Sequence, residues 1–321
     1  MLTLSRREFL KLGGLLAAAA GMGEQASLFA QGLERLAKGN IKVLWIQGQS
    51  CSGCSVSLLN TENPDALELL TQYISLVFHQ TVGAAQGDTV TQVLEGALKE
   101  KPQYLLAVEG AIPFGMPEAC VIAGRPLTEL LPGLISNAKY VVGIGTCAAF
   151  GGIPAAEGNL TGAVSVMEFM RKTGMKPEGK LVNCPLCPDH PESMIGTMAY
   201  LAGKGYPKVN PELLTADMFF SRSTHDDCPR YHYYTKHMFA QKFGDDGCLF
   251  KLGCVGALAH TECPRRQWNG GVNWCVRASA PCLACSNEKF ARKKDFPFYR
   301  KSEKYRTVTY NEADRKGVSA Q

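Results

Sequence analysis

The cysteines of this chain are the residues whose number and spacing point most directly to chemistry. The 321 residues include 13 cysteines, and two pairs of them form C-x-x-C motifs, Cys51–Cys54 and Cys282–Cys285. An odd number argues against a framework built only from disulfides, and a chain of this length can bury an apolar core without such cross-links. Thiolates drawn from well-separated loops are typical of metal sites. The spacings are looser than those of a zinc finger, which favours iron–sulfur clusters.

The first C-x-x-C motif follows directly after a predicted buried strand. Ile41–Ile46 is mostly apolar and β-favouring, as expected of a strand that is covered on both faces. The next four residues break this pattern, and Gly53 inside the motif lets the backbone approach a bulky inorganic group closely. Ligands of an open α/β sheet bind beyond the carboxyl ends of its strands, so a cofactor is expected at this loop.

Strands and helices are expected to alternate after this loop. Strands are predicted at residues 74–79, 104–108, 140–144 and 181–183, and helices at residues 55–70 (with a break at Asn63-Pro64), 89–99 and 192–201. The alternation predicts an α/β fold with a doubly wound, mostly parallel sheet. The last two strands lead into Cys147 and Cys187, which should therefore lie at the same sheet edge as the first C-x-x-C motif.

Regular periodicity fades from Thr224 onward, while the density of cysteines rises. His225 lies three residues before Cys228, and an imidazole can replace a thiolate as a ligand. Six further cysteines follow, namely Cys248, Cys254, Cys263, Cys275, Cys282 and Cys285. A region with so many thiols and so little pattern is expected to be held by its metals rather than by a large apolar core.

The N-terminus reads as an export signal. Arg6 and Arg7 stand in the twin-arginine pattern Ser5-Arg6-Arg7-Glu8-Phe9-Leu10-Lys11, which a short apolar run, residues 12–20, follows. This run is far shorter than the ~20 residues that a membrane span needs. We therefore expect residues 1–38 to be a twin-arginine signal segment rather than an ordinary amphipathic helix. The protein should then be periplasmic, and soluble or peripherally bound to a membrane.

Taken together, these motifs resemble the small subunit of nickel–iron hydrogenases, including the nickel–iron–selenium type. The resemblance runs from Ile41 to about Phe298, and its motifs are Gln49-Ser50-Cys51-Ser52-Gly53-Cys54-Ser55, Val108-Glu109-Gly110-Ala111-Ile112-Pro113, Gly145-Thr146-Cys147-Ala148, Cys187-Pro188-Asp189-His190-Pro191, and Trp268-Asn269 before Trp274-Cys275. It implies a flavodoxin-like domain at residues 39–203 and an irregular iron–sulfur cluster-binding domain at residues 204–321. It also implies three 4Fe–4S clusters in a row, and a separate large subunit that carries the nickel–iron site.

Matching positions in the motifs assign the cluster ligands. The resemblance implies a proximal cluster on Cys51, Cys54, Cys147 and Cys187. It implies a medial cluster on Cys263, Cys275, Cys282 and Cys285, and a distal cluster on His225, Cys228, Cys248 and Cys254. Cys120 and Cys184 have no assigned role, and no catalytic residue is expected on this chain.

Three positions depart from the usual family pattern. Many relatives have proline where Cys275 stands, and their medial cluster is a 3Fe–4S type, so a cysteine here implies a 4Fe–4S cluster. Leu186 replaces the glycine that usually precedes the ligand Cys187, which leaves the nearby Cys184 as a competing ligand. Gly53 and Gly152 stand where oxygen-tolerant relatives have two extra cysteines, so an ordinary proximal cluster is expected.

Several polar positions have more than one interpretation. Glu109 ends a predicted strand in the same cleft, and a capping or surface carboxylate is as plausible there as a functional one. His190 is expected to be structural. The basic tract from Lys289 to Arg306 fits a solvated face better than a docking face. No C-terminal membrane helix is apparent, so the electron acceptor is expected to come to the protein.

The function expected from these features is electron transfer within a periplasmic hydrogenase that takes up or evolves hydrogen. Electrons would pass between the large subunit and an external acceptor, either a cytochrome or a membrane electron-transfer subunit. One alternative is an iron–sulfur quinone-reductase subunit related to respiratory complex I, which the leader and the motifs after Thr224 disfavour. Another is a zinc- or disulfide-stabilised secreted binding protein. The net charge of +5 is too mild to indicate a nucleic-acid partner.

Overall fold

The computed structural model describes residues 42–99 and 104–292. Its centre is a five-stranded sheet in the order β2-β1-β3-β7-β9, in which all neighbouring strands are parallel. The strands are β1 (Lys42–Gln47), β2 (Ser75–His79), β3 (Tyr104–Glu109), β7 (Tyr140–Ile144) and β9 (Leu181–Cys184). The predicted α/β fold with a parallel, doubly wound sheet is confirmed.

Both faces of the sheet are covered, which explains the unbroken apolar runs of its central strands. On β1, Val43 and Trp45 pack into one buried cluster, while Leu44 and Ile46 pack into the other. Successive side chains of a strand point to opposite faces, so a strand in the middle of two layers must be apolar at every position. The helices α3 (Gly53–Leu59) and α9 (Pro191–Gly203) cover the first face.

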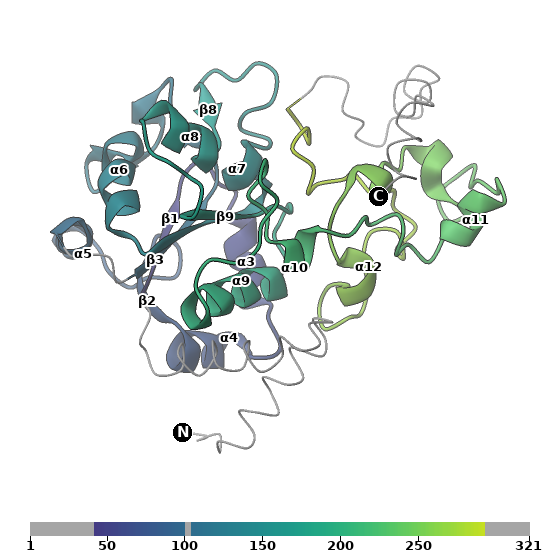
Figure 1. Cartoon of the computed structure of the whole chain (residues 1–321), viewed down its shortest axis with the longest axis horizontal. Coiled ribbons are helices and arrows are strands. Elements are labelled where there is room, and N and C mark those ends of the chain that lie inside the picture. Colours follow the sequence, from purple (N-terminus) through teal and green to yellow (C-terminus); the bar gives the residue numbers. More distant parts are fainter. Residues whose placement is uncertain (1–41, 100–103, 293–321) are drawn as a thin grey trace.

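The opposite face is covered by α5 (Asp88–Lys99), α6 (Leu127–Asn137) and α8 (Val166–Lys172), so the sheet lies between two helical layers (Figure 1). The predicted helix at residues 55–70 is interrupted, as expected around Asn63-Pro64. The chain resumes with α4 (Ala66–Glu68) and η2 (Leu69–Tyr73), where Asp65 accepts a hydrogen bond from the Glu68 backbone N–H in a capping box.

The loops at the carboxyl edge of the sheet contain short added elements. β4 (Ile112–Pro113) pairs antiparallel with the distant β8 (Ala163–Val164), and β5 (Val121–Ile122) pairs with β6 (Arg125–Pro126) in a short hairpin. The remaining elements here are η3 (Pro117–Ala119) and α7 (Gly145–Phe150), a short helix that starts directly after β7.

The part of the chain after residue 216 is irregular. Its helical elements are all short: α10 (Asp217–Phe220), α11 (Tyr231–Thr235), η4 (Leu249–Leu252), η5 (Gly256–Leu258) and α12 (Cys263–Arg266). Its apolar clusters are also small, and each includes cysteine side chains at its margin. Before it enters this part, the chain is held at the sheet: the backbone N–H of Asn183 on β9 donates to Leu214 O at 2.8 Å.

The predicted signal at residues 1–38 lies outside the described residues. Within the described ranges, no helix combines the length and the apolar character that crossing a bilayer requires.

Candidate metal centres

All 13 cysteines lie within the described residues, and each is a free thiol. Eleven of the thiols fall into three neighbouring groups, which we call the first, second and third thiol groups; Cys120 and Cys184 lie outside them.

The first thiol group lies at the carboxyl edge of the sheet. Cys51 is on the loop after β1, Cys54 is in the first turn of α3, Cys147 is in α7 after β7, and Cys187 follows β9. Burial raises the pKa of Cys147 to about 12, and the nearby charges of Cys187 and Cys51 add to this effect. Cys51 likewise raises the pKa of Cys187, after burial. The predicted convergence of these strand ends is what the structure shows.

Cys184 lies apart from this group. Its thiol donates to Thr197 Oγ1 at 3.3 Å, inside the apolar layer between the sheet and α9. Burial raises its pKa, and the charge of Asp189, rather than that of a cysteine, adds to this. The geometry therefore favours Cys187 over Cys184 as a ligand beside Cys51.

Glycines keep space free around the sulfur atoms of the first group. A Cβ at Gly145 would lie 2.5 Å from Cys54 Sγ, and one at Gly152 would lie 2.9 Å from Cys147 Sγ. Both glycines have positive φ, +77° and +50°, which other residues adopt only with strain. Backbone N–H groups also point at these sulfurs: Asp189 N lies 3.3 Å from Cys54 Sγ, and Gly53 N lies 3.4 Å from Cys51 Sγ. Glycine-lined sulfurs that accept N–H groups fit an iron–sulfur cluster.

Glu109 holds the loop that carries the first C-x-x-C motif. Its side chain is buried, so the interpretation of Glu109 as a surface carboxylate is wrong. Its Oε1 accepts hydrogen bonds from Ser50 Oγ at 2.9 Å, from Cys54 N at 3.2 Å and from Ser55 N at 3.4 Å. The carboxylate therefore binds the free N–H groups at the start of α3, where a negative charge is favoured.

The second oxygen of Glu109 joins β1 to the same helix. Oε2 accepts from Trp45 Nε1 at 3.0 Å, from Gln47 Nε2 at 3.2 Å and from Ser55 Oγ. Ser55 Oγ also lies 3.0 Å from His79 Nε2. Since His79 Nδ1 accepts the backbone N–H of Thr81, Nε2 carries the proton and donates to the serine. No local sequence pattern indicates this network, because β2 brings His79 to it from 24 residues away.

The second thiol group comprises Cys263 at the start of α12, together with Cys275, Cys282 and Cys285. Burial raises the pKa of Cys263 to about 11, and Cys275 adds to the increase. Burial also raises the pKa of Cys285, with Cys263 as the next largest cause. Ala284 N donates to Cys282 Sγ at 3.4 Å. The structure thus brings together the four residues that the resemblance implied.

The third thiol group comprises Cys228, Cys248 and Cys254, and the turn that carries Cys228 begins at His225. Burial raises the pKa of Cys254 to about 12, and Cys248 and Cys228 contribute further. The backbone N–H of Cys228 donates to His225 O at 3.1 Å. Burial lowers the pKa of His225, although Asp226 opposes the shift, and a lowered pKa favours the neutral imidazole, which is the form that binds metals.

The three groups adjoin one another. The backbone N–H of Cys187 in the first group donates to the thiol of Cys285 in the second. Thr146 Oγ1, next to Cys147, donates to the carbonyl oxygen of Cys285. The backbone N–H of Cys282 in the second group likewise donates to the thiol of Cys254 in the third. The order along the molecule is therefore first, second, third.

The spacing within each group differs from that of a single-ion site. Among the described residues, no three His, Cys, Asp or Glu side chains are grouped closely enough to hold one metal ion. Zinc needs all its ligands at 2.0–2.3 Å from one centre, as a rule. A cubane cluster binds one cysteine per iron, so its cysteines stand around a larger body. The donor sets fit clusters better than zinc.

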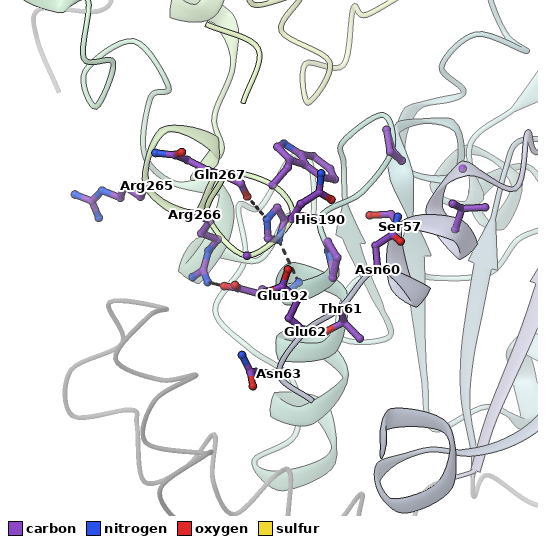
Figure 2. Close-up of a pocket in the computed structure, with 18 residues that line it drawn as sticks. Ser57, Asn60, Thr61, Glu62, Asn63, His190, Glu192, Arg265, Arg266 and Gln267 are labelled. Atoms are coloured by element: carbon purple, nitrogen blue, oxygen red, sulfur yellow. Dashed lines mark hydrogen bonds and ion pairs between the residues drawn. The ribbon is translucent and has the colours of Figure 1, made fainter. Parts of the chain in front are cut away.

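A cavity of about 500 Å³ lies beside the first thiol group. Its wall comes from the start of α3 and the loop after it, from Pro188 to Glu192, and from Arg265 to Gly271. Figure 2 shows His190 between Gln267 and Glu192 in this wall: Nε2 donates to Gln267 O at 2.6 Å, and Nδ1 accepts from Glu192 N at 3.2 Å. Both nitrogens of His190 are thus used in hydrogen bonds, which supports a structural role.

Comparisons with known proteins identify both parts of the chain. The family model for the C-terminal region of NiFe/NiFeSe hydrogenase small subunits matches residues 220–299, and the model for the 20 kDa subunit of NADH ubiquinone oxidoreductase matches residues 51–201. The periplasmic [NiFeSe] hydrogenase small subunit of Desulfomicrobium baculatum is 38% identical over 318 residues, which cover 93% of this chain and 99% of the relative. The periplasmic [NiFe] hydrogenase small subunit 1 of Nitratidesulfovibrio vulgaris is 34% identical over 310 residues, which cover 92% and 93%.

Solved structures agree with these relatives. The H2-activated [NiFeSe]-hydrogenase of Dm. baculatum superimposes with a TM-score of 0.75 at 36% identity, and the match covers 81% of this chain and 98% of that chain. The [NiFeSe] hydrogenase of Desulfovibrio vulgaris Hildenborough gives the same TM-score, identity and coverage.

Proposed function

This chain belongs to the small subunits of the nickel–iron and nickel–iron–selenium hydrogenases, and from that premise we propose that it relays electrons through three 4Fe–4S clusters. The relay would connect the nickel–iron site of a large subunit with an external acceptor. The observation that carries the proposal is the contact between successive thiol groups, Cys187 with Cys285 and Cys282 with Cys254. Groups joined in this order form a continuous row of redox sites.

In this proposal, the first thiol group holds the proximal cluster, the second holds the medial cluster, and the third with His225 holds the distal cluster. When bound, each cluster supplies one-electron redox chemistry. The chain's own residues position the sulfurs, exclude bulky side chains from them, and direct backbone N–H groups at them. These N–H groups favour the thiolate form, and the buried surroundings limit access of water.

The face around Cys51 is proposed to bind the large subunit. Cys51 itself is exposed, and exposed apolar side chains lie on the elements that follow the carboxyl ends of the strands: Val56, Leu59, Phe114, Met116, Ile153 and Leu160. Exposed apolar side chains on neighbouring loops are typical of a protein–protein contact surface when they form one patch. The cavity beside α3 adjoins this face, since the exposed Val56 contributes to its wall.

The finer assignments of place and partner follow from the relatives. Periplasmic location and export by the twin-arginine route are proposed on the strength of the periplasmic relatives and of Arg6-Arg7. A cytochrome or a membrane subunit is proposed as the acceptor. A flavodoxin-like domain at 39–203 and a cluster-binding domain at 204–321 are the proposed units. The complex I-related alternative accounts for residues 51–201 alone, and the second and third thiol groups lie beyond them.

The proposal is tested on the purified two-subunit complex. We expect about twelve iron atoms on this chain, broad visible absorption, and bleaching of that absorption by hydrogen. Cys187→Ser should alter the cluster signals, whereas Cys184→Ser and Cys120→Ser should leave the iron content unchanged. A colourless, zinc-containing protein, or one with about four irons per chain, would contradict the three-cluster assignment.

A further inference from the structure

Two of the three tryptophans of this chain, Trp268 and Trp274, stand at the ends of one turn, which we call the indole turn (residues 268–274). The turn lies in the chain between Cys263 and Cys275, two residues of the second thiol group. Both indoles take part in the same small apolar cluster, and cysteines of the second and third thiol groups pack at its margin. The indole turn therefore holds two N–H donors close to sulfur atoms.

Hydrogen bonds within the indole turn fix its backbone. Trp268 N donates to Asn273 O at 2.7 Å, and Val272 N donates to Trp268 O at 3.0 Å. The side chain of Asn273 also takes part, since its Oδ1 accepts the backbone N–H of Trp274 at 2.9 Å. Gly271 has a φ of +84°, which allows the chain to reverse within so few residues. The turn thus fixes the backbone from which both indoles project.

The indole N–H of Trp274 is buried without an acceptor. The side chain is 4% exposed, and in the parts of the chain that the structure describes Nε1 has no hydrogen-bond partner. Leu249 and Leu252 pack in the same apolar cluster, and their side chains accept no hydrogen bonds. The cysteines at the margin of this cluster are Cys228, Cys254, Cys263 and Cys282. A buried N–H without a partner is costly, and an iron–sulfur cluster held by such cysteines supplies sulfur acceptors.

The indole N–H of Trp268 is directed at the sulfur of Cys263. Burial raises the pKa of Cys263, and hydrogen bonds from the side chains of Thr261 and Trp268 work against this increase. Thr261 Oγ1 lies 3.6 Å from Cys263 Sγ. The ring of His190 holds the indole from the other side, with 4.9 Å between the two ring centroids. Cys263 therefore receives side-chain donors, whereas the sulfurs of the first thiol group receive backbone N–H groups.

We infer that the indole N–H groups of Trp268 and Trp274 both donate to sulfurs of the cluster in the second thiol group and raise its midpoint potential. The inference rests on the proposed function, because it requires a cluster at that group. A hydrogen bond to sulfur stabilises the more negative, reduced form over the oxidised form. In the step concerned, one electron passes from the first group to the second; no bond forms or breaks, and both indole protons stay on nitrogen.

The second thiol group is the better acceptor for Trp274 than the third. Cys228 and Cys254 of the third group also lie at the margin of the apolar cluster, so proximity alone does not separate the two. However, Trp274 directly precedes Cys275 in the chain, and the rest of the indole turn follows Cys263. Both ends of the turn are thus tied to the second group. Packing alone would be served equally well by phenylalanine, which has no N–H.

The test is a redox titration of the purified two-subunit enzyme, followed by electron paramagnetic resonance. The medial midpoint is identified as the one that Cys275→Pro replaces. Trp268→Phe and Trp274→Phe keep an aromatic ring and remove the N–H. Each should lower the equilibrium constant for reduction of the medial cluster by roughly threefold to tenfold, where tenfold corresponds to about 59 mV for one electron. The proximal and distal midpoints should change by less than about twofold in the same constant.

Trp45→Phe is the matched control. It also removes a buried indole N–H, but that group donates to Glu109 Oε2 at 3.0 Å and not to a sulfur. The medial midpoint of this variant should equal that of the wild type. An unchanged or more positive medial midpoint in either Trp268→Phe or Trp274→Phe would overturn the inference. An equal shift in Trp45→Phe would overturn it as well, because the effect would then not depend on a donor to sulfur.

A measurement on the wild type stands apart from the behaviour of the variants. In enzyme whose tryptophans carry ¹⁵N in the indole, pulsed electron paramagnetic resonance of the reduced medial cluster should show a ¹⁵N coupling. Trp268→Phe/Trp274→Phe should abolish it. Absence of this coupling in the wild type, or a coupling to the distal cluster alone, would overturn the inference even if a variant lost its iron. Failure of the proposed function is distinguishable, because the wild type would then show no medial signal at all.

Discussion

The backbone N–H of Val255 donates a hydrogen bond of 2.9 Å to the carbonyl oxygen of Cys282. Val255 directly follows Cys254, so this bond fastens the loop of the third thiol group to that of the second. It lies beside the N–H of Cys282 that is directed at the Cys254 sulfur. Hydrogen bonds therefore join the loops of the two groups, so a substitution in one group should alter the geometry of the other.

Gly145 is the sharpest test of the space around the first thiol group. Gly145→Ala would place a Cβ 2.5 Å from Cys54 Sγ, so we expect loss of the proximal cluster, about four irons by cubane stoichiometry. Gly158→Ala is the control, because Gly158 has a similar φ of +88° with nothing within 4 Å of the added Cβ. It should cost only about 1 kcal/mol of backbone strain and keep all its iron. Iron analysis distinguishes the two; full iron in Gly145→Ala would refute the assignment.

Glu109→Ala should destabilise the protein by roughly 3–5 kcal/mol, because it leaves the buried donors of Trp45, Gln47 and Ser55 without their acceptor. Glu109→Gln should cost less, since the amide oxygen retains part of the network. Glu118→Gln, an exposed carboxylate on η3, serves as the control. Thermal unfolding should rank the three variants in stability, with Glu118→Gln the most stable and Glu109→Ala the least stable. A Glu109→Ala variant as stable as the control would contradict this prediction.

Cys275 should decide the type of the medial cluster. With four thiolates in the second group, the oxidised wild type should show no 3Fe–4S signal in electron paramagnetic resonance. Cys275→Pro removes one ligand, so that signal should appear, and hydrogen evolution should decline more than hydrogen uptake because the medial potential rises. A strong 3Fe–4S signal in the intact wild type would show that Cys275 is not a ligand.

Stability should depend on pH through His79. Burial lowers the pKa of its folded form below 6.5, although Glu109 opposes the shift. The unfolded chain then binds more protons than the folded one between the two pKa values. The stabilisation that the neutral His79 gives to the folded state is fully present above pH 6.5. It is lost as the pH falls toward the pKa of His79 in the folded protein. The difference in melting temperature between wild type and His79→Gln should accordingly shrink between pH 7.5 and pH 5; a constant difference would contradict this.

Export is tested at Arg6 and Arg7, which lie outside the described residues. Replacing both with lysine should leave the folded precursor in the cytoplasm, because the twin-arginine pair is the recognised feature of the signal. Cell fractionation measures the distribution of iron-containing protein. Normal periplasmic accumulation of the lysine variant would show that another signal directs export.

The sheet and the first thiol group could be predicted because their signals are local. An unbroken apolar run such as β1 indicates a strand in the buried sheet. The C-x-x-C motif directly after it indicates that the cysteines lie at the carboxyl edge of that sheet. Helices α6, α7 and α8 were not predicted. Contacts between distant segments could not be predicted either. No sequence pattern near Cys187 indicates that its N–H donates to Cys285, and none near His79 indicates its hydrogen bond with Ser55. Tertiary folding decides these pairs, and they are what order the thiol groups.

After α9, the chain returns to the sheet and covers the exposed edge of β9. β9 is the edge strand of the sheet, and Leu213 and Leu214 cover it: Asn183 N donates to Leu214 O and Asn183 Nδ2 to Leu213 O, both at 2.8 Å. A chain cut after Gly203 would bare this edge and offer it as a template for strand addition, the usual start of aggregation. The cap on the sheet thus comes from residues past the end of α9, so the proposed unit at 39–203 depends on Leu213 and Leu214 of the following unit to cover its edge strand.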